Sequence, residues 1–130
     1  MASDAPDPYD AHDPVFAKLR AICLGLPDTS EVQAWGHPTF RVGVGKALKI
    51  FCACGADGST RSLSFKCEPD VQHALVASDP RFTIAAYVGK HGWVSMDVAQ
   101  RKSWDEVAAL IRESYQLIAP KASLAKLRDA

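Results

Sequence analysis

The densest group of residues that could bind a ligand lies at 87–93, Tyr-Val-Gly-Lys-His-Gly-Trp. Lysine and histidine can contact an anion, and tyrosine and tryptophan can stack on a planar group. Gly89 and Gly92 permit a tight loop. Loops of this kind present polar tips from a rigid scaffold. The segment therefore predicts a binding loop, and the surrounding elements must position it.

The chain around the loop is predicted to form one α+β domain. Its 130 residues, 48% of them hydrophobic, are enough for one core. Asp13-Pro14 predicts a helix start, Glu68-Pro69 a second and the Ser103-Trp-Asp-Glu106 capping box a third. Alternating or apolar runs predict five strands, at 39–44, 47–54, 61–67, 81–86 and 93–98. The order α-βββ-α-ββ-α predicts two layers, with the helices on one face of an antiparallel sheet.

Composition indicates where the folded domain begins and in which cellular compartment the protein is expected. Residues 1–12 are acidic and Pro-rich and are predicted to be a disordered lead, followed by a single domain at 13–130. The N-terminus has no secretory pattern, and no apolar run is long enough for a membrane span. Four cysteines are interpreted as reduced core thiols. We therefore expect a cytoplasmic protein without membrane contact.

Strand alternation predicts what the uncovered face of the sheet displays. It combines cations with aromatic rings, and the binding loop adjoins it. This composition suits phosphate contact and base stacking, although the chain has 15 basic and 15 acidic residues. The alternative is an ordinary water-facing sheet whose aromatics pack under a loop or a dimer partner. The predicted nucleic-acid-binding residues are Arg41, Lys49, Phe51, Lys66, Arg81, Tyr87, Lys90, His91 and Trp93.

Other chemistry has less support in the sequence. Cys52, Cys54 and Cys67 fall on the apolar side of their strands, and the four histidines share no ligand spacing, so we predict no metal site. No phosphate loop, zinc-protease helix or nucleophile elbow is present, so we predict no cofactor and no catalytic residue. The chain has no asparagine and so lacks one of the two amide side chains that read adenine.

Several segments together resemble the bacterial MmcQ/YjbR family. They are Trp35-Gly-His-Pro-Thr-Phe40 after Leu26-Pro27, Leu63-Ser-Phe-Lys-Cys-Glu-Pro69, the 87–93 loop, and Glu113-Ser-Tyr115. The resemblance covers roughly 13–120. It implies a small α+β domain similar to secretion chaperones, and DNA binding by likeness to a double-wing arrangement. The positions carried over are Lys66, Tyr87, Lys90 and Trp93, although Gly89 replaces the family's usual asparagine.

These observations predict a non-enzymatic cytosolic module that binds nucleic acid, most simply DNA, through the open face and the 87–93 loop. One alternative is a protein-interaction or dimerisation domain that uses the same face. Another is a small-anion-binding protein or enzyme, in which Lys66, Tyr87, Lys90 and His91 form the anion pocket.

Overall fold

The computed structural model describes residues 13–55, 62–85 and 88–129. The predicted lead at 1–12 and the predicted site residue Tyr87 lie outside these ranges. The described helices are α1 (Pro14–Leu24), α2 (Pro69–Ser78), α3 (Trp104–Ile118) and α4 (Lys121–Asp129). The strands are β1 (Thr29–Ala34), β2 (His37–Val42), β3 (Lys49–Cys54), β4 (Ser62–Lys66), β5 (Phe82–Ile84) and β6 (Trp93–Asp97). Short 3₁₀ turns are η1 (Gly45–Ala47), η2 (Gly89–His91) and η3 (Val98–Gln100).

The helices begin at the capping residues that the sequence predicts. The Asp13 carboxylate accepts from the Val15 N–H at 2.9 Å, and Pro14 occupies the first turn, where its missing N–H costs nothing. At α3, the Ser103 hydroxyl accepts from the Glu106 N–H at 3.1 Å. The Glu106 carboxylate accepts from the Lys102 N–H, one residue before the N–H that a standard capping box uses.

The predicted α+β class is confirmed, with one strand more than the five expected. The sheet is antiparallel throughout, in the order β1-β2-β3-β4-β6-β5. The extra strand is β1, a polar segment that lacks the apolar alternation of a half-buried strand. It pairs with β2 through a turn at Trp35-Gly36, where both residues have positive φ, +53° and +83°. Tryptophan rarely adopts this conformation, which explains why the hairpin was not predicted.

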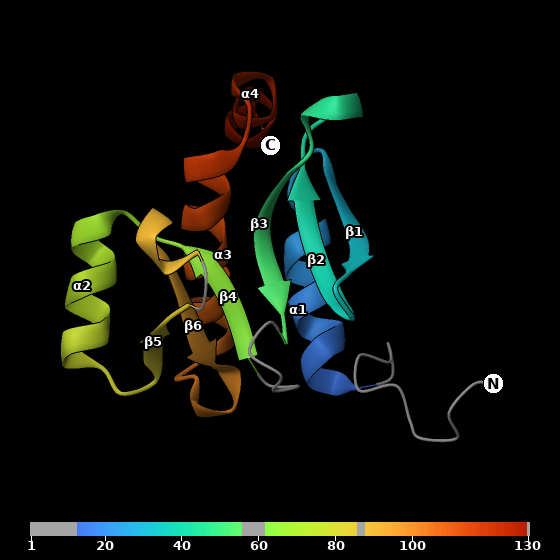
Figure 1. Cartoon of the computed structure of the whole chain (residues 1–130). Coiled ribbons are helices and arrows are strands. Elements are labelled where there is room, and N and C mark those ends of the chain that lie inside the picture. Colours follow the sequence, from blue (N-terminus) through green and yellow to red (C-terminus); the bar gives the residue numbers. More distant parts are fainter. Residues whose placement is uncertain (1–12, 56–61, 86–87, 130) are drawn as a thin grey trace.

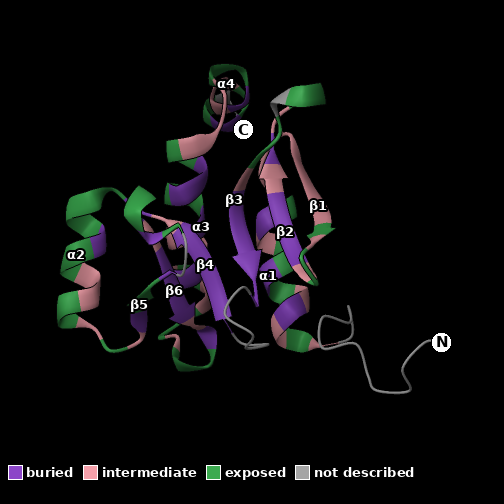
Figure 2. Cartoon of the chain, viewed as in Figure 1, coloured by how far each residue is buried: buried purple, intermediate pink, exposed green. Residues whose placement is uncertain are grey.

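The core lies between the sheet and the helices behind it. Figure 1 shows α1 and α3 side by side on one face, and α2 beside the β5–β6 edge. The buried surfaces of these elements meet in a single cluster (Figure 2). All four cysteines are free and buried, as predicted. Burial raises the pKa of the Cys67 thiol to about 11 and raises the pKa of Cys52 and of Cys54 as well.

The end of the chain closes on the corner between α1 and β1. The Tyr115 hydroxyl donates to the Pro27 carbonyl at 2.7 Å. From α4, Ser123 and Lys126 donate to the Asp28 carboxylate at 2.7 and 2.8 Å. These hydrogen bonds, that of Lys126 first, lower the pKa of Asp28. Asp28 itself has a φ of +59°, so the partners hold an unfavourable backbone conformation in place.

Candidate nucleic-acid interface

Lys66 and Trp93 stand directly opposite each other across the β4–β6 pair. Their chain neighbours Phe65 and Val94 are also paired and are fully buried on the side of the helices. Because side chains alternate along a strand, Lys66 and Trp93 project from the other face. Opposed side chains of an antiparallel pair have Cβ atoms roughly 4.5–5.5 Å apart. The structure therefore places this cation and this aromatic ring side by side, as alternation predicted.

A short turn brings two further polar side chains to the same end of the sheet. Lys90 and His91 are exposed in η2, which the hydrogen bond from the Gly92 N–H to the Gly89 carbonyl closes. Gly92 has a φ of +92°, and its carbonyl accepts from the Cys67 N–H at 2.9 Å. A Cβ atom at Gly92 would lie 2.3 Å from the Cys67 carbonyl oxygen. The turn therefore sits against the end of β4, next to Lys66.

The side chain of Gln72 holds this turn from α2. Its amide nitrogen donates to the Gly89 carbonyl at 2.7 Å and to the Trp93 carbonyl at 2.9 Å. Gln72 is buried, whereas the adjacent Val71 is exposed. The amide therefore fixes both ends of the 89–93 segment. Sequence patterns do not identify this role, because glutamine is mostly exposed in folded proteins.

The predicted exposure of Phe51 is wrong. Phe40 pairs with Cys52 and Arg41 with Ile50, so Phe51 is the extra residue of a β-bulge. It is fully buried, and its ring meets Tyr115 edge-on with centroids 5.5 Å apart. Alternation resumes in a changed phase after the bulge, so Ile50 takes the open-face position instead.

The bulge at Phe51 also determines which face of the sheet Lys49 occupies, and Arg41 lies on the open face as predicted. Lys49 pairs with the buried Val42 and so belongs to the side of the helices, where it is exposed at the start of β3; its predicted place on the open face is wrong. Arg41 is half-buried on the open face, and its Nε donates to the Thr39 hydroxyl at 3.3 Å. It is separated from Lys66 by one strand, about 10 Å.

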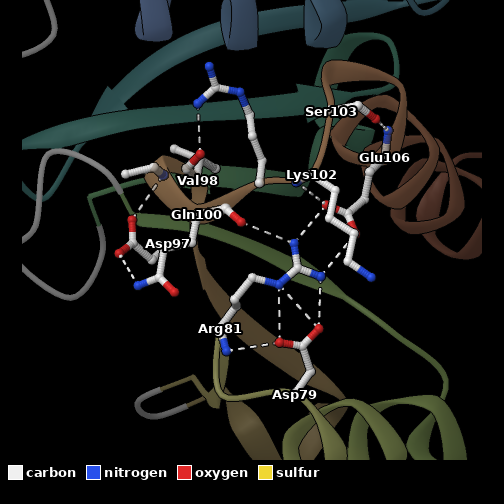
Figure 3. A network of polar contacts seen from close by, with 10 residues as sticks. Asp79, Arg81, Asp97, Val98, Gln100, Lys102, Ser103 and Glu106 are labelled. Atoms are coloured by element: carbon white, nitrogen blue, oxygen red, sulfur yellow. Dashed lines mark hydrogen bonds and ion pairs between the residues drawn. The ribbon is translucent and has the colours of Figure 1, made fainter.

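Arg81 belongs to a separate network of ion pairs (Figure 3). Its guanidinium donates to both oxygens of Glu106, at 2.8 and 2.9 Å, and to both oxygens of Asp79. These hydrogen bonds lower the pKa of Glu106 and of Asp79 and raise that of Arg81. Two carboxylates already neutralise the charge, so Arg81 is not a free phosphate contact. Its role is to join the start of β5 to the start of α3.

The middle of the open face carries only small side chains. Ser64 and Ser95 are opposed on β4 and β6, and their hydroxyl oxygens are 3.0 Å apart. Thr39 and Ala53 continue this row on β2 and β3. All four are buried, with relative exposures between 0% and 7%, so this row presents no exposed side chain. The structure thus places Lys66 and Trp93 on this face, at the end of the β4–β6 pair that adjoins the exposed η2 residues Lys90 and His91, with Arg41 two strands from Lys66.

The sequence model of the YjbR family matches residues 24–117. The chain belongs to the YjbR family. No curated protein matches it.

A solved structure supports the same fold for this YjbR protein. It is similar to the crystal structure of Deinococcus radiodurans protein DR2400, described as a DUF419 domain, with a TM-score of 0.71. The two share 22% sequence identity, and the match covers 84% of each chain. Identity at this level supports the architecture alone.

Two further findings on the YjbR chain concern metal ligands and helix length. Within 13–55, 62–85 and 88–129, no three residues of His, Cys, Asp or Glu are grouped so as to hold a metal ion. No helix in those ranges has the length and apolar character needed to cross a bilayer.

Proposed function

We propose that this YjbR protein is a non-enzymatic cytoplasmic module that binds nucleic acid, DNA foremost, through the open sheet face and the η2 turn. The observation that carries the proposal is the opposed pair Lys66 and Trp93, next to the exposed Lys90 and His91. An aromatic ring supplies a platform for a base, and adjacent cations contact the flanking phosphates. Gln72 holds the turn before a ligand arrives, which reduces the entropy cost of binding.

Charge determines how strongly binding should depend on salt. In this proposal Lys66, Lys90 and Arg41 are the three cations that contact phosphates, since Lys90 is exposed and the other two are half-buried on the open face. For three phosphate contacts, counterion release predicts a slope of log K against log salt of about −2 for a single strand and about −2.7 for a duplex. With 15 basic and 15 acidic residues, the formal net charge is zero, so net charge adds no long-range attraction to DNA. Binding should therefore be moderate and confined to low and intermediate salt.

Fluorescence anisotropy of labelled single- and double-stranded DNA tests the proposal. Wild-type protein is compared with the Lys66→Ala/Lys90→Ala double variant at several salt concentrations. The matched control is Lys18→Ala/Lys121→Ala, which removes the same charge from exposed positions on α1 and α4. Salt-sensitive binding that only the first variant loses supports the proposal. Absence of binding at low salt, or equal loss in both variants, contradicts it.

A protein-binding role for the same face is the second candidate. Ile50 occupies an open-face position beside the Lys66–Trp93 end, and aliphatic and aromatic side chains together can anchor a protein partner. Light scattering of wild type and Trp93→Ala separates the two candidates. A dimer that Trp93→Ala dissociates, together with no DNA binding, favours the interaction domain.

A further inference from the structure

The open face has a second polar feature at the other end of the β4–β6 pair. A hollow of about 320 Å³ is lined there by Ser62, Thr83, Ser95, Asp97 and Arg81, among others. Ser62 and Asp97 are directly opposed, as Lys66 and Trp93 are at the first end. The two pairs are four positions apart along each strand, a distance of about 13 Å.

Ser62 gives this hollow its ligand-binding character. The residue is 4% exposed, and its hydroxyl has no hydrogen-bond partner among the described residues. Buried hydroxyls are nearly always paired in folded proteins, and an unpaired one requires an explanation. A hydroxyl that lines a hollow and lacks a partner is satisfied most simply by a bound polar group.

The charges around the hollow determine which polar group fits. Arg81 is fully engaged by Asp79 and Glu106 and so offers no free cation to a phosphate. Asp97 holds the Ala99 N–H and the Gln100 amide, each at 3.0 Å, through different oxygens (Figure 3). Each carboxylate oxygen retains further acceptor capacity. The hollow therefore suits a neutral group with N–H or O–H donors, such as a base edge or a sugar hydroxyl.

We propose that the preferred ligand is single-stranded nucleic acid, with one unstacked nucleoside in the hollow. This inference rests on the proposed function. The strand lies along β4 and β6, with its phosphates near Lys66 and Lys90 and one base edge against Asp97 and Ser62. A separation of about 13 Å corresponds to roughly four nucleotide spacings of a stacked strand and to fewer when it is extended. A duplex cannot use the hollow, because its Watson–Crick edges are already paired.

The test is an anisotropy comparison of a mixed-sequence oligonucleotide with its own duplex, at equal salt, for three proteins. These are wild type, Ser62→Ala and the control Ser78→Ala, whose exposed hydroxyl on α2 donates to the Ala74 carbonyl. We expect wild type to prefer the single strand. Ser62→Ala should weaken single-strand binding by about two- to tenfold, the value of one hydrogen bond, and leave duplex binding unchanged. Its salt slope should not change, because no phosphate contact is lost.

The Tm without DNA distinguishes a ligand-binding Ser62 from a purely structural one. Loss of a structural serine would lower the Tm. Removal of an unpaired buried hydroxyl should leave the Tm of Ser62→Ala unchanged or raise it. The inference is overturned if single strand and duplex bind with equal affinity and Ser62→Ala has no effect. In that case, salt-sensitive binding that Lys66→Ala/Lys90→Ala loses still supports the proposed function. A lowered Tm of Ser62→Ala overturns the inference as well. Absence of all DNA binding overturns both proposals.

Discussion

The hydroxyl of Ser114 accepts a hydrogen bond of 2.9 Å from the backbone N–H of Lys66. The same oxygen donates to the Phe51 carbonyl at 2.6 Å. Ser114, a buried serine of α3, thus satisfies one backbone group on each of β3 and β4, one position beyond their Cys52–Phe65 pair. The residue that anchors the backbone of Lys66 lies on the face opposite to the Lys66 side chain.

Replacement of Ser114 by alanine should therefore lower stability. It leaves a buried carbonyl and an N–H without partners, each of which costs about 1–3 kcal/mol. We expect a loss of about 2–4 kcal/mol in the free energy of unfolding, measured by urea denaturation. Ser78→Ala is the control, since its hydroxyl is exposed, and it should change stability by less than about 0.5 kcal/mol. Equal effects of the two substitutions would contradict the bridging role.

Substitution of Phe51 should mainly lower stability, whereas substitution of Trp93 should mainly weaken DNA binding. Phe51→Ala empties a position that is fully buried against Tyr115, and should cost about 3–5 kcal/mol in urea denaturation. Trp93 is half-buried on the open face, so Trp93→Ala should cost clearly less and instead weaken DNA binding, by about 1–3 kcal/mol if a base stacks on the ring. A Trp93→Ala protein with unchanged affinity would contradict the stacking role.

The Arg81 network should make the fold sensitive to acid. The folded-state pKa values of Asp79 and Glu106 are lowered, chiefly by hydrogen bonds from Arg81. The unfolded carboxyls titrate near their ordinary values of about 3.9 and 4.3. The folded state therefore binds fewer protons at these two carboxyls than the unfolded state does. Their contribution to the free energy of unfolding is complete above about pH 5 and is lost as the pH falls through the lowered folded-state pKa values.

Arg81→Met removes the partner and should flatten the acid limb of a stability–pH profile, measured as the urea midpoint from neutral pH to about pH 3. The difference between wild type and variant should be largest near neutral pH and should shrink in acid. Arg112→Met removes a charge from an exposed position of α3 and controls for net charge. Parallel profiles for wild type and Arg81→Met would contradict the prediction.

Gly92 should be far less tolerant of a side chain than Gly36, although both have positive φ. Alanine at Gly36 would meet no atom within 4 Å, and so should cost only the left-handed backbone strain, about 1–2 kcal/mol. Alanine at Gly92 would collide with the Cys67 carbonyl at 2.3 Å and displace the η2 turn. Thermal unfolding and DNA anisotropy of the two variants should show a larger loss of both properties for Gly92→Ala.

Much of the fold could be predicted from local signals. Asp13, Pro14, Pro69 and Ser103 mark helix starts through capping chemistry that involves only near neighbours. Strand β1 could not be predicted, because its segment is polar and its hairpin turn contains a tryptophan with positive φ. The segment is a strand because it pairs with β2, and this pairing depends on residues outside the segment.

Site residues could be predicted from the sequence only on strands whose side chains alternate between the two faces without a bulge. Lys66 and Trp93 were placed correctly because β4 and β6 pair without a shift. Phe51 was misplaced because a bulge in β3 has no marker such as glycine in the sequence. The network around Arg81 and the Gln72 clamp depend on which helix packs beside the β5–β6 edge. Such contacts follow from the tertiary arrangement and have no local pattern.

The closure of α3 and α4 on the α1–β1 corner has a consequence for how the chain folds during synthesis. The partners Tyr115–Pro27, Ser123–Asp28 and Lys126–Asp28 are 88, 95 and 98 residues apart. The corner, with its unfavourable Asp28 backbone, leaves the ribosome long before the groups that hold it. Such distant contacts slow folding, because the intervening loop must close before they form. The nascent chain at 27–28 therefore lacks the contacts from α3 and α4 that hold this corner until those helices have been synthesised.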